Sequence, residues 1–198
     1  MGSIRRLKWK FRHYLRRNRT PILIFVIGMV AIVGLSIGAL DEPETPKVSE
    51  IEGEIHDLVN LQREANGLHP LESHDGIRNV ALSHSQDMSE RDFYSHISPD
   101  GVGPDERLRE SGIYCGPTGE FVGENIHIVP LNERIEGYHG DTIVLETSSD
   151  IAQYVVGSWM DSEGHRDNIL HPDFRLQGVG VYIDKSSEEV YITQKMCG

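Results

Sequence analysis

Basic residues are scarce over most of this 198-residue chain. Eight of its 19 Lys and Arg residues fall within residues 1–20, which leaves residues 41–198 with 11 basic against 31 acidic residues, a net charge of −20. A surface of that charge repels phosphate, which excludes a nucleic-acid-binding domain. Aromatic residues make up only 7% of the chain, but 38% of its residues are apolar, which excludes a wholly disordered protein.

Several well-known catalytic and ligand-binding motifs are missing as well. The sequence contains no HExxH, no pair of CxxC motifs, no P-loop and no GxSxG. Two histidines that fall in polar loops, His96 and His165, lie 69 residues apart, so their spacing does not show whether they meet. Local motifs alone therefore assign no chemistry.

Charge is absent from Pro21 to Leu40, a run of 20 mostly apolar residues. As a helix this run would extend about 30 Å, the thickness of a bilayer's hydrocarbon core. The basic residues before it predict a cytoplasmic tail over residues 1–20, and the acidic residues after it predict that the chain continues outside the cell membrane. The alternative is a cleaved signal peptide, although the run exceeds the usual length of a signal-peptide core.

The rest of the chain is expected to comprise a short linker and one domain. Residues 41–50 are rich in proline and acids, which indicates an extended acidic linker. Residues 51–198 are long enough to bury a core, and their patterning predicts an α+β fold, with helices covering a small antiparallel sheet. Four helices are expected: one with an S-x-x-E capping box at Ser49–Glu52 that stops at Gly67, one from Ser73 or Asp75 to about Arg91, a short one between Pro104 and Gly112, and one capped by Ser148 or Ser149. The expected strands are Glu120–Val129 and a hairpin of residues 178–184 and 190–196.

The chain has two cysteines, Cys115 and Cys197. An extracytoplasmic domain lies where disulfides persist, and bridging these two would stabilise the fold by up to about 4.5 kcal/mol in the chain-entropy picture. Two free thiols are the alternative. The compartment favours the bridge.

Several short runs, taken together, resemble one family. From about residue 55 to residue 194 the chain resembles a CAP domain (cysteine-rich secretory protein, antigen 5 and pathogenesis-related proteins), also called the SCP-like extracellular domain, in its prokaryotic branch. The runs that carry the resemblance are Leu58-Val59-Asn60 with Arg63 and Gly67-Leu68, residues 81–88 (ALSHSQDM), Phe93-Tyr94-Ser95-His96, Gly123-Glu124-Asn125-Ile126, residues 159–162 (WMDS), Gly164-His165-Arg166, Asn168-Ile169-Leu170, and Gly178-Val179-Gly180-Val181 with Thr193-Gln194.

The resemblance implies an α-β-α sandwich with a surface cleft, in which two histidines and two acids meet and some members bind Zn²⁺. Carried over by position, His96 and His165 are the two metal ligands and Glu124 is one acid. The second acid is Glu163 or, as the other choice, Asp161. Two protein ligands are fewer than a structural zinc site uses, so we expect any divalent metal to be weakly held.

Two further residues belong to the expected cleft. His84 lies on the same helix face as Val80 and Met88, where a satisfied core or cleft-edge histidine is favoured and a ligand is the alternative. Arg166 is expected to pair with a nearby carboxylate such as Asp161 or Asp87.

Three functions are compatible with this sequence. The first is a membrane-anchored binding module that engages a small ligand, a lipid or an envelope component through the His/Glu cleft. The second is a metal-assisted hydrolase of peptide or cell-envelope polymer, in which Glu124 would be the catalytic base. The third is a structural domain with a vestigial cleft. The missing nucleophile and the small number of metal ligands favour the binding module.

Overall fold

The computed structural model describes residues 46–117, 121–136 and 142–198. The predicted cytoplasmic tail, the predicted transmembrane helix over residues 21–40 and the first half of the acidic linker lie outside the described residues. Among the helices that the structure describes, none combines the length and the apolar character needed to cross a membrane.

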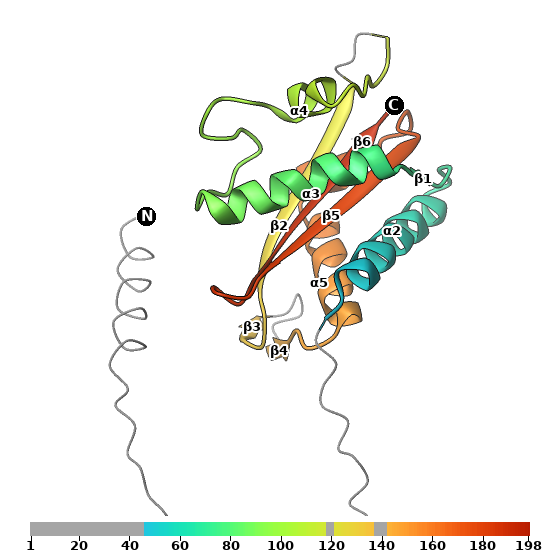
Figure 1. The fold of residues 1–198 in the computed structure, drawn as a ribbon. Helices are drawn as coiled ribbons and strands as arrows, with labels where there is room; N and C mark the ends of the chain where they lie inside the picture. Colours follow the sequence, from blue (N-terminus) through green and yellow to red (C-terminus); the bar gives the residue numbers. More distant parts are fainter. Residues whose placement is uncertain (1–45, 118–120, 137–141) are drawn as a thin grey trace, which may run out of the picture. The chain divides into compact units, whose positions relative to one another are not determined.

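The described chain contains helices and strands close to the predicted positions (Figure 1). The helices are α2 (Val48–Ala65), α3 (Asp75–Glu90), α4 (Pro104–Glu110), α5 (Ser148–Asp161) and α6 (Glu163–Ile169). The strands are β1 (Glu72–Ser73), β2 (Val122–Pro130), β3 (Arg134–Glu136), β4 (Thr142–Val144), β5 (Leu176–Asp184) and β6 (Glu189–Cys197). The expected α+β class and the β5–β6 hairpin are confirmed, whereas α6 was not anticipated.

The main sheet is mixed rather than purely antiparallel. Its strand order is β1-β5-β6-β2, and the two-residue strand β1 runs parallel to β5 while the other pairs are antiparallel. Strands β3 and β4 form a separate two-stranded sheet. The expectation of a wholly antiparallel sheet fails only at β1, which is too short to produce a periodic pattern in the sequence.

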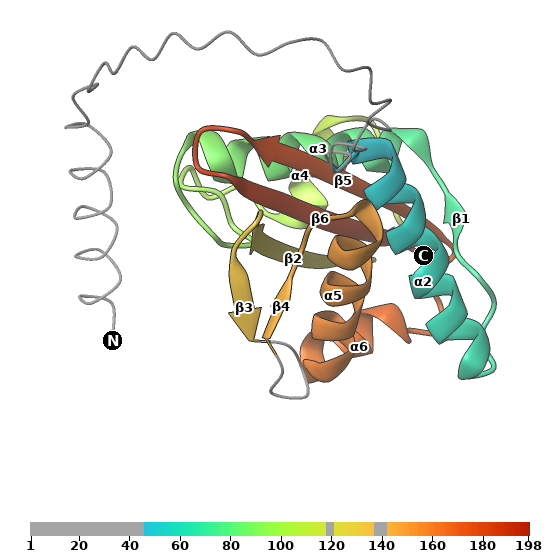
Figure 2. The same ribbon diagram turned by 90° about the horizontal axis from the view of Figure 1, so that it is seen from below.

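The sheet lies between two layers of helices (Figure 2). Helix α3 covers one face, which we call the α3 face, and helices α2 and α5 cover the other, which we call the α5 face. Side chains of β6 alternate between the two: Val190, Ile192 and Met196 enter the large apolar core beside α2 and α5. Tyr191 and Cys197 pack in two smaller clusters with residues of α3.

Glycines allow α3 to approach the sheet closely. A Cβ atom added to Gly178 would lie 2.1 Å from the Arg78 nitrogen, and one added to Gly180 would lie 2.0 Å from the Leu82 nitrogen. Both glycines belong to the GVGV run, so no larger residue fits at either position without moving the helix. The Ser85 hydroxyl donates to the Gly180 carbonyl at 2.8 Å and completes this contact.

The caps of two helices differ from those predicted. Helix α2 begins after Lys47, and no side chain caps it. Glu52, the expected acid of the Ser49 capping box, instead accepts hydrogen bonds from Arg78 and from the Val181 amide. Helix α5 does have a capping box, but its N-cap is Thr147, with Asp150 as the reciprocal partner.

A disulfide and a set of hydrogen bonds from Arg63 fix the segments around the sheet. Cys115 and Cys197 form the predicted disulfide, which joins the segment after α4 to the end of β6. Arg63, which is fully buried on α2, donates to the carbonyls of Ile169 and His171 at 2.7 and 2.9 Å. These bonds hold the end of α6 against the rest of the domain.

Candidate functional site

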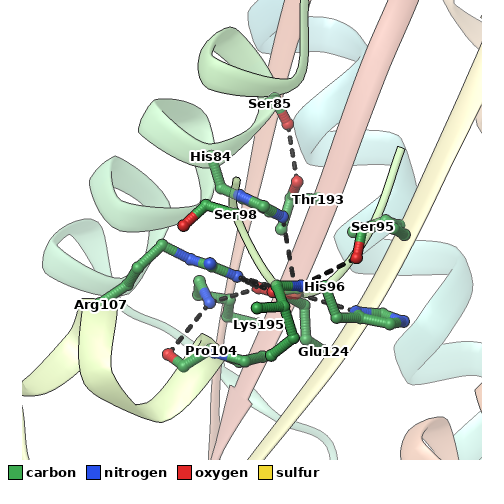
Figure 3. Close-up of polar contacts among 12 residues, drawn as sticks. His84, Ser85, Ser95, His96, Ser98, Pro104, Arg107, Glu124, Thr193 and Lys195 are labelled. Carbon is green, nitrogen blue, oxygen red and sulfur yellow. Dashed lines mark hydrogen bonds and ion pairs between the residues drawn. The ribbon is translucent and has the colours of Figure 1, made fainter. Parts of the chain in front are cut away.

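A buried cluster of charged side chains surrounds Glu124 on the α3 face (Figure 3). Glu124 is 6% exposed and lies on β2 directly opposite Lys195 of β6. Its carboxylate receives Nδ1 of His96 at 2.9 Å, Nη2 of Arg107 at 2.9 and 3.1 Å, and Nζ of Lys195. Both carboxylate oxygens are therefore occupied by nitrogen donors.

The same donors hold the loop that carries His96. Nη2 of Arg107 also donates to the His96 carbonyl at 2.9 Å, and Nη1 donates to the Val102 carbonyl at 2.8 Å. Lys195 reaches the Pro104 carbonyl at 3.3 Å. Since Arg107 comes from α4 and Lys195 from β6, the cluster connects the loop between α3 and α4 to the sheet.

Glu124 is an ionised carboxylate at neutral pH. Burial alone would raise the pKa of Glu124, but the hydrogen bond with His96 and the charges of Lys195 and Arg107 together hold that pKa well below its usual range. Burial lowers the pKa of Lys195 to about 8, against the attraction of Glu124. Because an ionised carboxylate only accepts hydrogen bonds, Nδ1 of His96 is the donor in this pair, which leaves Nε2 as the nitrogen that can bind another group.

His165 approaches the same stretch of β2 from α6. The Asn125 side chain donates to the His165 carbonyl at 3.2 Å, and the Asn168 side chain donates to the Glu124 carbonyl, also at 3.2 Å. Partial burial is the main cause that lowers the pKa of His165. The hydrogen bonds of Asn125 and Asn168 hold α6 against β2.

His84 is buried beside the cluster. It is 1% exposed, and its Nε2 lies 3.7 Å from the nearer Glu124 oxygen, which is too long for a hydrogen bond. In the described chain, neither ring nitrogen of His84 has a hydrogen-bond partner. Burial is the main cause that lowers the pKa of His84, to about 4, so the ring is neutral at pH 7. It is thus not the satisfied core histidine that one reading of the sequence predicted.

The remaining predicted cleft residues make no polar contact with Glu124 among the residues that the structure describes. Asp161 and Glu163 are exposed, and across the described residues neither makes a polar contact with the cluster. Arg166 donates to the Met160 carbonyl at 2.9 Å, so its predicted pairing with Asp161 or Asp87 is wrong. Asp87 pairs with Arg91 instead.

The described part of the chain contains no group of three or more His, Cys, Asp and Glu residues arranged to hold a metal ion. Glu124 is the hydrogen-bond partner of His96, and the other hydrogen bonds of its carboxylate are with Arg107 and Lys195.

Arg107 and Lys195 are site residues that the sequence reasoning missed. Lys195 is fully buried in a strand whose other residues carry no charge apart from Glu189 at its start. A lysine near the end of such an uncharged run was the available signal, since lysine is almost never fully buried without a partner. Arg107 gave no comparable signal, because it lies among several charged residues of α4.

Comparison with known proteins places this architecture in a family. Residues 56–196 match the family model described as the cysteine-rich secretory protein family, CAP. The chain is 30% identical over 140 residues to the uncharacterized Bacillus subtilis protein YkwD, a match that covers 71% of this chain and 45% of that protein. It is 32% identical over 130 residues to the uncharacterized membrane protein YlbC of the same organism, covering 66% of this chain and 31% of YlbC.

Among solved structures, the fold resembles an extracellular protein from Bacillus anthracis that contains an SCP domain. The identity is 28% and the TM-score is 0.56, over 75% of this chain and 40% of that one. The CAP domain of enterococcal PrgA shares the fold at 17% identity and a TM-score of 0.52, over 76% of this chain and 61% of that one. The chain spans less than half the length of the two curated relatives. Its family match covers most of the chain, and the protein belongs to the cysteine-rich secretory protein (CAP) family.

Proposed function

We propose that this domain is an extracytoplasmic binding module that engages its ligand at His96 and His165 and holds a divalent cation weakly there. The observation that carries the proposal is the 2.9 Å hydrogen bond between Nδ1 of His96 and Glu124. This bond fixes the tautomer of a half-exposed ring, so that Nε2 presents its electron pair outward. A bound ion would offer open coordination positions to oxygen atoms of a small ligand, a lipid headgroup or an envelope component.

The expected metal is Zn²⁺, and its affinity should be low. Metal ligation requires neutral imidazoles, and burial lowers the pKa of His165 from its ordinary value, which favours its neutral form. Two protein ligands are fewer than the four of a structural zinc site, so water would complete the coordination.

The hydrolase alternative requires Glu124 to accept a proton, and the cluster argues against that role. Both oxygens of Glu124 already receive donors from Arg107, Lys195 and His96. A general base works best with a pKa near the working pH, whereas the surrounding cations hold the pKa of Glu124 well below its usual range. The geometry therefore supports binding over hydrolysis.

We also propose that the apolar run from Pro21 to Leu40 anchors the domain at the outer side of the cell membrane. Three observations support this placement: the disulfide, which is typical of an oxidising compartment; the likeness to an extracellular SCP-domain protein; and the likeness to YlbC, which is named a membrane protein.

The proposal is tested by titrating the full chain in detergent with Zn²⁺ by calorimetry. We expect His96→Ala and His165→Ala each to abolish measurable binding, because one imidazole cannot hold the ion. His69→Ala is the matched control, since His69 is exposed and lies outside the cluster. Zn²⁺ binding that survives both substitutions would contradict the proposal. Turnover of a peptide library by the native chain, absent from a Glu124→Gln protein that is still folded, would establish the hydrolase instead.

A further inference from the structure

A row of amide side chains crosses the otherwise apolar α5 face of the sheet and reaches the helix that carries His165. It has one residue from each of three neighbouring strands and one from α6: Gln177 on β5, Gln194 on β6, Asn125 on β2, and Asn168. The three strand residues are fully buried. By the alternation of side chains along a strand, they lie on the same face as the large apolar core. The row thus connects the interior of the domain to α6.

Hydrogen bonds run along the whole row in one direction. Nδ2 of Asn168 donates to Oδ1 of Asn125 at 2.9 Å, and Nδ2 of Asn125 donates to Oε1 of Gln194 at 3.0 Å. Nε2 of Gln194 in turn donates to Oε1 of Gln177 at 2.8 Å. Since Nδ2 of Asn125 also donates to the His165 carbonyl at 3.2 Å, the backbone of His165 is attached directly to the row.

The direction of these bonds is set at the α6 end. The His165 carbonyl can only accept, so Asn125 must turn its nitrogen toward it. Gln194 must then offer its oxygen to Asn125 and its nitrogen to Gln177. Within the described residues, Nε2 of Gln177 at the far end is left buried without a partner. This unpaired donor is therefore a consequence of the bond to His165.

The row is costly to the core in which it lies. A buried donor without a partner is unfavourable and uncommon in native proteins. Methionines in place of Gln177 and Gln194 would fill similar space and leave no polar group to satisfy. What the amides add is a fixed orientation of Asn125, because its nitrogen is held between the Gln194 oxygen and the His165 carbonyl.

Helix α6, which follows α5 (Figure 2), depends on tertiary bonds of this kind. It has only 7 residues and no side-chain cap, and a helix of that length is not stable alone. Arg63 holds its carboxyl end. Asn125 holds the half that contains His165. Asn168 adds a bond to the Glu124 carbonyl at 3.2 Å.

We propose that Asn125 and Gln194 are positioning residues of the cation site. They set where α6, and with it His165, lies relative to His96. Glu124 holds the ring of His96, and the next residue of the same strand holds the backbone of His165. Consecutive side chains of β2 therefore hold the two histidines from opposite faces of the sheet. Gln194 acts through the orientation of Asn125. This inference rests on the cation site proposed above.

The main test replaces both glutamines of the row, as Gln177→Met/Gln194→Met, in the full chain in detergent. Removing both partners of a buried bond is nearly neutral for stability, so the urea midpoint should stay within about 0.5 M of the native value. Zn²⁺ affinity, measured by calorimetry, should fall about fivefold or more, because Asn125 loses its fixed orientation. Hydrogen exchange of the backbone amides of residues 166–170 should become about fivefold faster. A merely structural role would not lower the affinity while leaving the stability intact.

Ile192→Met is the matched control, because it places a methionine on the same face of β6 but outside the row. It should change neither Zn²⁺ affinity nor the exchange of residues 166–170. Asn168→Asp keeps the inference testable should the double variant fail to fold, since Asn168 is only half-buried. A new carboxylate on α6 would by its charge tighten Zn²⁺ binding, whereas the lost donor should weaken it about threefold or more.

Unchanged exchange of residues 166–170 in the double variant and in Asn168→Asp would overturn the proposal. Faster exchange with unaltered Zn²⁺ affinity would also overturn it, and so would tighter Zn²⁺ binding by Asn168→Asp. If the native chain binds no Zn²⁺, the cation site itself fails, and the exchange rates still decide whether the row holds the helix of His165. The two proposals therefore fail separately.

Discussion

On the α5 face of the sheet, β6 buries Val190, Ile192 and Met196 against two helices, and on the α3 face the same strand buries Thr193 and Lys195. All five side chains are buried, so these two sets differ in polarity and charge and not in how deeply they are buried. The α5 face gains stability from apolar area, which is spread over many contacts. The α3 face depends on a few charges that satisfy one another.

This contrast explains where the proposed cation site lies. An apolar core spreads its stability over many contacts, but it offers no hydrogen-bonding groups to a polar ligand. The cluster around Glu124 is vulnerable to single losses, yet it holds His96 in one orientation through a hydrogen bond. The α3 face is therefore more sensitive to single substitutions than the α5 face, and it holds binding groups in fixed positions.

The largest effect should come from breaking the charge balance of the α3 face. Glu124→Gln leaves Lys195 and Arg107 buried without their carboxylate, and we expect a loss of about 3–5 kcal/mol in the free energy of unfolding. Urea denaturation of the full chain measures it. Lys195→Met is the control and should cost less, because Glu124 keeps Arg107 and His96 as partners. A cost below about 1 kcal/mol for Glu124→Gln would mean that water reaches the cluster.

The next effect is a loss of folding stability at acidic pH. The pKa of His84 falls to about 4 in the folded state, mainly through burial, so the unfolded chain binds this proton first as the pH drops below 6.5. Stability should thus be greatest above pH 6.5 and should fall between pH 6.5 and 4, with His84 contributing on the order of 3 kcal/mol.

His84→Gln tests this contribution. The difference in unfolding free energy between the native chain and His84→Gln should change across pH 6.5–4, measured by urea denaturation at each pH. Burial also lowers the pKa values of His127 and His165. The unfolding free energy of the native chain and of His84→Gln should therefore both still depend on pH in part. A constant difference across this range would show that His84 does not titrate as its burial implies.

The elements of the fold were largely predictable from the sequence, because each depends on local pattern. Helix α3, helix α4 and the β5–β6 hairpin follow from apolar periodicity and from Pro104 and the glycines. One prediction failed where tertiary contacts intervened. Glu52 was expected to cap its own helix, but folding brings Arg78 and the Val181 amide to it. The resemblance to a known family, rather than periodicity, supplied His96, Glu124 and His165.

The centre of the site was not predictable from one sequence. Glu124 and Lys195 are 71 residues apart and meet only through the register of β2 against β6. Sequence patterns predict that a strand forms, but they do not fix its partner. The expected second acid, Glu163 or Asp161, remains exposed, and the cations Arg107 and Lys195 accompany Glu124 instead.

A smaller effect concerns how closely α3 packs on the sheet. Gly180→Ala would place a Cβ atom 2.0 Å from a backbone nitrogen of α3, so the helix must shift, at a cost of about 1–3 kcal/mol. Gly53→Ala is the matched control, because its Cβ meets nothing within 4 Å and it lies inside α2, where alanine should stabilise by up to about 1 kcal/mol. Thermal unfolding compares the two. Equal effects would mean that the close approach of α3 is not required.

The smallest expected effect is the loss of one neutral hydrogen bond on the α3 face, and it can be compared with the loss of a buried charge there. The hydroxyls of Thr193 and Ser85 lie 2.9 Å apart, and Ser85 donates its one hydrogen to the Gly180 carbonyl at 2.8 Å. Thr193→Val removes the Thr193 hydroxyl and leaves the bond to Gly180, so it should cost less than about 1 kcal/mol. Ile192→Val, its neighbour on the α5 face, should cost about 0.5–1.5 kcal/mol through the small cavity that it leaves. If Thr193→Val instead cost as much as Glu124→Gln, the vulnerability of the α3 face would come from its hydrogen bonds in general. A small cost assigns that vulnerability to the buried charges, which are the groups that hold His96 in place.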